Sequence, residues 1–192
     1  MARIWLVRHG HAAAGFSEDH DPGLDELGRA QAVAVAIALE PFGPMPIVVS
    51  PLLRTLETAE PLTRAWRVSP LVDERVAEVP SPTDDLAERG AWLSQAMAGT
   101  WADLGADLEA WRDTLVATVM ALPGDTVVVS HFIAINALIG SAIGDDRVMH
   151  VSVGNGSITT LDTTSSGSGS GSSSSSGLSV VDIGVEATTQ VT

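Results

Sequence analysis

The 192-residue chain contains no cysteine and no lysine. Without cysteine it has no disulfide framework, no thiolate zinc site and no cysteine nucleophile. Without lysine it has no Schiff-base chemistry and no Walker-type phosphate loop, which requires a lysine. All ten basic residues are therefore arginines, and their positions are the main guide to any anion-binding site.

Positive charge as a whole is scarce. The formal net charge is −14 and the sequence pI is about 4.4, which argues against broad binding to nucleic acid or to anionic membranes. We expect neither partner. A protein of this charge that handles phosphate must build a local positive site against its own overall field. The sequence carries no indication of oligomeric state.

Long apolar runs are also missing. The run Ile4 to Val7 ends at the charged Arg8 and is shorter than the apolar core of a signal peptide. The richest apolar stretch, Phe132 to Gly144, is too short and too interrupted to span a bilayer. We therefore expect a cytoplasmic protein. With 45% hydrophobic residues, the chain is long enough for one core and too short for two, so we expect a single domain over residues 1–192.

Apolar runs alternate with helical periodicities along the first three quarters of the chain. Strands are predicted at residues 4–7, 46–50 and 126–130. Helices are predicted from the N-cap Asp25 to about Leu39, from Pro51 through Ala59 with a kink or break at Pro61, and over residues 84–98, 106–121 and 132–143. This alternation predicts a three-layer α/β/α sandwich with a mainly parallel sheet.

The helical periodicity also predicts which side chains form the core. In the first helix the predicted face consists of Leu27, Ala30, Ala34 and Ile37. In the two helices over residues 84–121 the predicted core consists of Trp92, Leu93, Met97, Leu108, Trp111, Leu115 and Met120. Two histidines, His20 and His150, are interpreted as surface or loop residues.

The C-terminal part has a different character. Residues 157–161 alternate like an edge strand, and residues 178–183 resemble its antiparallel partner. Between them, residues 165–177 are only serine and glycine. Because such a tract has no apolar surface to bury, we expect a flexible loop joining the strands of an edge hairpin.

The three predicted parallel strands end in similar polar residues. The first strand ends at Arg8 and His9, the second is followed by Arg54, and the third by His131. Ligands of open α/β sheets bind beyond the carboxyl ends of the strands. Two arginines and two histidines are therefore expected to converge there, although each alone is more often a structural or surface residue.

These motifs resemble a known family. The stretch Leu6-Val7-Arg8-His9-Gly10 resembles the signature of the histidine phosphatase superfamily, also called phosphoglycerate mutase-like. Residues 50–59, Ser-Pro-Leu-Leu-Arg-Thr-Leu-Glu-Thr-Ala, are similar to its second motif, and residues 128–131, Val-Val-Ser-His, to its third. Residues 28–32, Gly-Arg-Ala-Gln-Ala, match a helix that the family usually has. The resemblance covers residue 3 to about residue 162.

The resemblance implies a phosphatase that needs no metal and no cofactor. His9 would attack the phosphorus atom of a small phosphorylated substrate or phosphoprotein and form a phosphohistidine, which water then cleaves. Arg8, Arg54 and His131 would hold the phosphate, and arginine suits this role because its planar, permanent charge donates two parallel hydrogen bonds. Gly10 would let the backbone approach the phosphate, although a simple turn glycine fits equally well.

The leaving group also needs a proton. The family has a carboxylate after the second motif, often within Asp-x-Arg-Leu-x-Glu, and Asp73-Glu74-Arg75-Val76-Ala77-Glu78 is similar to this pattern. The spacing places Glu78 at the acid/base position, with Glu74 as the alternative.

The residues after the first motif depart from the mutases of the family, which continue Arg-His-Gly-Glu-Thr-x-x-Asn. This chain has His11-Ala12-Ala13-Ala14-Gly15 instead, and its opening is more similar to the small phosphatases. A mutase and a non-catalytic module that binds a phosphorylated ligand remain alternatives. A third alternative is a metal pair of His9 and His11, assisted by Asp19, His20 and Asp21. On an extended strand end, however, the side chains of His9 and His11 point to opposite sides.

Overall fold

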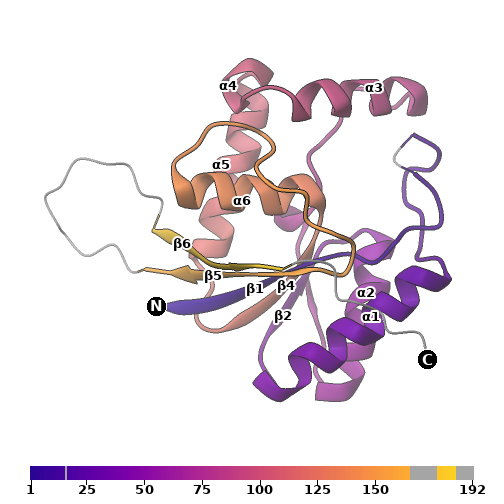
Figure 1. Cartoon of the computed structure of the whole chain (residues 1–192), viewed down its shortest axis with the longest axis vertical. Coiled ribbons are helices and arrows are strands. Elements are labelled where there is room, and N and C mark those ends of the chain that lie inside the picture. The colour runs from indigo at the N-terminus through magenta and orange to yellow at the C-terminus, as the bar shows by residue number, and fades with distance from the viewer. Residues whose placement is uncertain (16, 165–176, 185–192) are drawn as a thin grey trace, which may run out of the picture.

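A single sheet of six strands lies at the centre of the computed structural model, which describes residues 1–15, 17–164 and 177–184 (Figure 1). Its strands are β1 (Ala2–Arg8), β2 (Ile47–Val49), β3 (Leu71–Val72), β4 (Thr126–Ser130), β5 (Ile158–Thr163) and β6 (Leu178–Ile183). They lie in the order β3-β2-β4-β1-β5-β6. The first four run parallel, whereas β5 and β6 form an antiparallel hairpin at one edge.

Helices cover both faces of this sheet. On one face lie α1 (Glu26–Leu39) and α2 (Leu53–Trp66), and on the other lie α5 (Ala106–Met120) and α6 (Phe132–Ile143) (Figure 1). Two further helices, α3 (Leu86–Met97) and α4 (Trp101–Leu104), lie farther out on the α5/α6 side. Short 3₁₀ turns occupy Glu40–Phe42 and Glu74–Val76. The predicted three-layer sandwich with a mainly parallel sheet and an edge hairpin is therefore confirmed.

The strands divide their side chains between two apolar layers. Ile4 and Leu6 of β1 pack on the α5/α6 side, and Trp5 and Val7 on the α1/α2 side. This follows from the two-residue period of a strand. The central strands are buried on both faces, which explains their continuous apolar runs in the sequence.

The buried face of α1 differs from the prediction. Asp25 caps the helix as expected, since its side chain accepts a hydrogen bond from the Gly28 N–H. However, Leu27 and Ile37 are 49% and 66% exposed. Half of the residues on the inward side are instead glycine or alanine, and the full set is Gly28, Gln31, Ala32, Val35, Ala36 and Leu39. The helix backbone approaches the loop after β1 too closely for large side chains, and a Cβ on Gly28 would lie 2.1 Å from the His11 carbonyl oxygen.

The predicted break at Pro61 does not occur, because α2 continues through this residue to Trp66. Proline removes one backbone donor from the helical ladder, which costs stability but does not by itself end a helix. Leu62 and Trp66, which follow Pro61, are buried in the core on this face of the sheet. Their burial favours continuation of the helix. It ends at Arg67, whose left-handed conformation has φ 56°.

The predicted core of α3 and α5 is only partly buried. Leu115 is fully buried, whereas the six other predicted residues pack as partly buried side chains against the core. The most buried tryptophan is Trp101, which begins α4, a helix that the periodicity did not predict.

His150, interpreted as a surface or loop residue, does lie in a loop, but its side chain is only 4% exposed. It packs so close to α6 that a Cβ on Gly140 would lie 2.3 Å from its Nε2 atom.

The strands at residues 157–161 and 178–183 are found as β5 and β6. Of the Ser/Gly tract at 165–177 that joins them, residues 165–176 lie outside the described residues. Across the described part of the chain, none of the helices has both the length and the apolar character needed to cross a membrane.

Candidate active site

The carboxyl ends of β1, β2 and β4 bring the predicted site residues together. His9 follows β1, Arg54 lies in the first turn of α2, which follows β2, and His131 lies between β4 and α6. Arg54 Nε is 3.3 Å from His9 Nε2, and the rings of His9 and His131 have centroids 5.2 Å apart. All three side chains are buried. The structure therefore gathers them from more than 120 residues of chain.

The hydrogen bonds of His9 define its tautomer. His9 Nδ1 is 2.8 Å from the Gly10 carbonyl oxygen, which only accepts, so Nδ1 carries the proton. Arg54 Nε only donates, so Nε2 of His9 presents its lone pair. Burial, reinforced by the charges of Arg54 and Arg8, lowers the pKa of His9 from 6.5 to about 3. At neutral pH His9 is therefore an uncharged imidazole with a lone pair on Nε2, as a nucleophile requires.

Arg8 is held from two directions. Its Nη1 donates to the Val153 carbonyl oxygen at 2.6 Å, and its guanidinium carbon lies 4.9 Å from the centroid of the Phe132 ring. Arg54 is the more buried of the two arginines, and its Nη1 lies 3.8 Å from Asp21. Burial lowers the pKa of Arg54, but a guanidinium stays charged in a protein. Two positive charges thus lie beside the His9 lone pair.

The carboxyl of Glu78 lies at the N-terminus of α6. It accepts backbone hydrogen bonds from Val79, Ile133 and Ala134 at 3.0 to 3.3 Å. Burial raises the pKa of Glu78 above its ordinary value, which favours the protonated form that a general acid needs. Glu78 lines the same pocket as His9. The alternative, Glu74, is exposed and is not among the residues that line this pocket.

Gly10 has a packing role. A Cβ at this position would lie 2.5 Å from the carbonyl oxygen of Gly28 in α1. Its N–H donates to Thr58 Oγ1 at 2.9 Å. These contacts explain why the first motif and the Gly28–Ala32 helix occur together: each provides a glycine where the two backbones touch, and Gln31 accepts a hydrogen bond from the His11 N–H.

Asn155 is a site residue that the sequence analysis missed. Its side chain donates to the His9 carbonyl oxygen at 3.1 Å and approaches the Gly10 carbonyl oxygen at 3.4 Å, and it lines the pocket. The residue lies in a Gly-Asn-Gly turn before β5. The two glycines indicate a tight turn at this position, but they do not indicate which residues the Asn155 side chain contacts.

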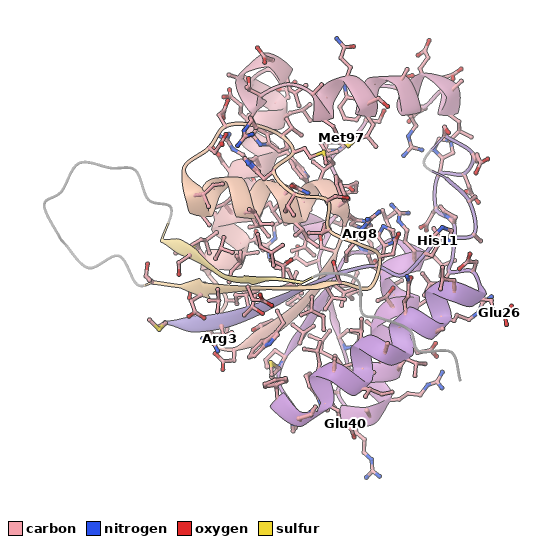
Figure 2. All side chains as sticks on the ribbon, in the orientation of Figure 1. Arg3, Arg8, His11, Glu26, Glu40 and Met97 are labelled. Carbon is pink, nitrogen blue, oxygen red and sulfur yellow. The ribbon has the colours of Figure 1, made fainter. Side chains whose placement is uncertain are left out.

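A pocket of about 540 Å³ is lined by Arg8, His9, Arg54, Glu78 and Asn155, and His131 lies behind this lining, with its ring centroid 5.2 Å from that of His9. In Figure 2, Arg8, His11 and Met97 lie around it, from the end of β1, the following loop and the end of α3. The remaining wall is largely apolar and includes Ala12, Ala13, Ala14, Leu93 and Phe132. Glu18 and Asp19 add negative charge to the loop side.

The residues of the alternative metal site each have a different hydrogen-bond partner. His11 Nδ1 bonds Asp25 at 2.8 Å, His20 Nδ1 bonds Arg89 at 2.7 Å, and Asp21 accepts from the Leu53 N–H. Within residues 1–15, 17–164 and 177–184, no group of three or more histidine or acidic side chains is arranged to hold a metal ion.

The buried neutral histidine predicts a pH dependence of stability. Unfolded His9 binds a proton below its usual pKa of 6.5, whereas folded His9 does so only near pH 3. Its contribution is therefore complete above pH 6.5 and is lost as the pH falls. Between pH 7 and pH 5 we expect the free energy of unfolding to fall by about 2 kcal/mol through His9 alone, with His131 acting in the same direction.

Urea denaturation of the wild type and of His9→Gln at both pH values measures this effect. The raised pKa of Glu78 acts in the opposite direction, but it is present in both proteins and cancels in the comparison. The drop in stability is expected to be about 2 kcal/mol smaller in His9→Gln. Equal drops in the two proteins would show that His9 is not buried in its neutral form.

Comparison with known proteins adds independent evidence. The family model of the histidine phosphatase superfamily (branch 1) matches residues 4–170. "Probable phosphoglycerate mutase GpmB" from Yersinia pestis is 29% identical over 167 residues, which cover 75% of this chain and 76% of that protein.

Among solved structures, a mycobacterial glucosyl-3-phosphoglycerate phosphatase complexed with VO3 has a TM-score of 0.65 and 29% identity. The match covers 84% of this chain and 93% of that one. A phosphoserine phosphatase from Entamoeba histolytica, in complex with 3-phosphoglyceric acid, has a TM-score of 0.67 at 22% identity, covering 84% and 91%. This last likeness concerns the fold alone.

Proposed function

The chain belongs to the histidine phosphatase superfamily, and we propose that it is a metal-independent phosphatase that hydrolyses a phosphomonoester or phosphoprotein through a phosphohistidine on His9. Members of this superfamily are phosphatases or mutases. The observation that carries the proposal is the His9 Nε2 lone pair, 3.3 Å from Arg54 Nε, in a pocket that the carboxyl of Glu78 also lines.

In the first step the Nε2 lone pair of His9 attacks phosphorus, and the P–O bond to the leaving group breaks. Protonated Glu78 gives its proton to the departing oxygen. Charge builds up on the three equatorial phosphoryl oxygens in the transition state. Arg8 and Arg54, with His131, stabilise that charge.

In the second step ionised Glu78 takes a proton from a water molecule, which attacks the phosphorus of the phosphohistidine. The P–N bond breaks, and neutral His9 and protonated Glu78 are restored together with free phosphate. No metal ion takes part in either step.

The direct test is hydrolysis of p-nitrophenyl phosphate in the presence of EDTA. Full activity after exhaustive dialysis against the chelator is expected. Activity that disappears with EDTA and returns with a divalent cation would overturn the proposed mechanism. A protein that binds phosphate or vanadate but hydrolyses nothing in a broad panel of phosphate esters would instead be the non-catalytic binding module.

A mutase is the alternative within the same family, and the name of the Yersinia relative favours it. The wall of this pocket argues against it. Apart from His11 and His20, the wall away from the phosphate-binding residues is apolar or acidic: its apolar side chains offer no donors to a carboxylate, and Glu18 and Asp19 repel one. The small residues at Ala12 and Gly15 also replace the threonine and asparagine side chains that mutases place after their first motif.

We therefore expect esters with an apolar, uncharged leaving group to be the better substrates. The kcat/KM for 1-naphthyl phosphate should exceed that for 3-phosphoglycerate by at least about tenfold. Steady-state phosphate release measures both values. Conversion of 3-phosphoglycerate into 2-phosphoglycerate faster than the release of inorganic phosphate would favour the mutase.

A further inference from the structure

The imidazole of His131 is fully buried, and its Nδ1 atom has no hydrogen-bond partner among the described residues. A buried polar group without a partner is costly to the folded state, so such a group next to the site residues calls for an explanation. The other nitrogen, Nε2, lies 2.8 Å from Ser50 Oγ. Which atom donates in this contact depends on where the histidine carries its proton.

The surroundings of Ser50 decide this question. Its hydroxyl has one proton to give, and its oxygen already receives the Leu52 N–H at 3.4 Å. Across the described residues, His131 Nε2 is the acceptor that this hydroxyl reaches. If Nε2 carried the proton, the buried hydroxyl would lose its acceptor. With Ser50 donating to Nε2, the hydroxyl proton and the Nε2 lone pair are both satisfied, and the proton of a neutral His131 lies on Nδ1, the one atom of the pair that is left without a partner.

Ser50 is itself held rigidly. Its N–H donates to the Val129 carbonyl oxygen of β4 at 3.1 Å. Its own carbonyl oxygen accepts the Thr55 hydroxyl from the first turn of α2 at 2.8 Å. With no solvent exposure, the hydroxyl of Ser50 has a fixed position opposite His131. The serine of the second motif is thus tied to both elements that carry the other site residues, β4 and α2.

We propose that Ser50 is a positioning residue that holds His131 in its Nδ1–H tautomer, so that an uncharged His131 donates a hydrogen bond to the phosphoryl group. The inference rests on the proposed function for the identity of the ligand. It also accounts for the unpartnered Nδ1: the His131 ring lies 5.2 Å from that of His9, so this N–H would serve an anionic oxygen bound beside His9.

The tautomer matters because His131 does not act as a cation. Burial and the neighbouring His9, Arg54 and Arg8 keep the pKa of His131 well below its usual range. A neutral imidazole donates from only one nitrogen. With the proton on Nε2, the Nδ1 lone pair would face the phosphate oxygens and repel them.

Nitrogen-15 NMR of the full-length, histidine-labelled protein without ligand tests this proposal. The His131 signals are identified by their loss in His131→Gln. We expect the wild-type spectrum to show Nδ1 protonated and Nε2 unprotonated, and Ser50→Ala to shift the proton to Nε2. A wild-type His131 protonated on Nε2 would overturn the proposal, and this result needs no folded Ser50 variant.

Binding of inorganic phosphate provides the functional readout. Ser50→Ala is expected to weaken it by about ten- to a hundredfold, the usual effect of a hydrogen bond to a charged group. Ser157→Ala removes another buried serine hydroxyl, one that makes no hydrogen bond within the described part of the chain, and should bind phosphate like the wild type. Unchanged phosphate binding by a folded Ser50→Ala would refute the role of Ser50.

The role of Ser50 and the phosphatase activity can be tested separately. Correct tautomer signals together with phosphate binding but no hydrolysis of any ester would refute the phosphatase and leave the role of Ser50 intact. Hydrolysis with an Nε2-protonated His131 would do the reverse.

Discussion

His9→Ala is expected to lose hydrolysis of p-nitrophenyl phosphate by roughly 10⁴-fold or more, the scale seen when a covalent nucleophile is removed. Phosphate binding should largely survive, because Arg8 and Arg54 are not held in place by the His9 side chain alone: Arg8 is fixed by Val153 and Phe132. The measurements are kcat for the ester and calorimetric titration with inorganic phosphate.

His11→Ala is the matched comparison. His11 lies two residues away but is about half exposed and is paired with Asp25 rather than with the phosphate-binding residues. Its loss should change kcat by less than about tenfold. The metal-pair alternative makes the opposite prediction, because both histidines would then be essential and EDTA would mimic either substitution. A His9→Ala variant that kept more than a tenth of the activity would show that another group is the nucleophile.

Glu78→Gln is expected to produce the second large effect, and its size should depend on the leaving group. For an alkyl phosphate, whose alkoxide needs a proton to depart, kcat should fall by about 10²–10⁴-fold. For p-nitrophenyl phosphate, whose phenolate departs readily without one, the loss in the first step should be much smaller. Glutamine preserves the size of the side chain and one oxygen, so the hydrogen bond from the Ile133 or Ala134 N–H can be kept.

The matched control for this carboxyl is Glu74→Gln, which changes an exposed carboxylate of the same motif and should behave as the wild type. The pH profile offers a second criterion. With alkyl phosphates the wild-type kcat/KM should fall as the pH rises through the raised pKa of Glu78, and this limb should be absent in Glu78→Gln. Because Glu78 also acts in the second step, which all substrates share, the comparison is made on kcat/KM, and equal losses of kcat/KM for both classes of leaving group would argue that Glu78 is structural.

Much of the site could be predicted because it depends on local patterns. The apolar runs that end at Arg8 and Ser130 form parallel neighbours in the sheet, so their following polar residues meet at one edge. The position of Glu78 was reached through the family resemblance, by its spacing from Asp73 and Arg75, and in the structure a short 3₁₀ turn over Glu74–Val76 lies between Asp73 and Glu78. Strand periodicity predicted the architecture, and motif spacing predicted most of the residues that line the pocket.

Contacts between distant segments could not be predicted. Asn155 meets the His9 carbonyl across 146 residues, and Ser50 meets His131 across 81. No periodicity links such pairs. The prediction of the inward face of α1 was wrong for a related reason. The backbones of Gly10 and Gly28 lie so close together that neither position has room for a side chain. A rule that places the largest apolar side chains inward fails where two backbones touch.

The most direct test of the central claim is to trap the intermediate. The protein is mixed with an excess of a rapidly cleaved aryl phosphate, denatured in alkali within the first turnovers to preserve an acid-labile phosphohistidine, and digested for mass spectrometry. One phosphoryl group is expected on the peptide that contains His9, with none in His9→Ala. Efficient hydrolysis without any phosphorylated peptide, or a phosphoryl group on a different residue, would contradict the proposed mechanism.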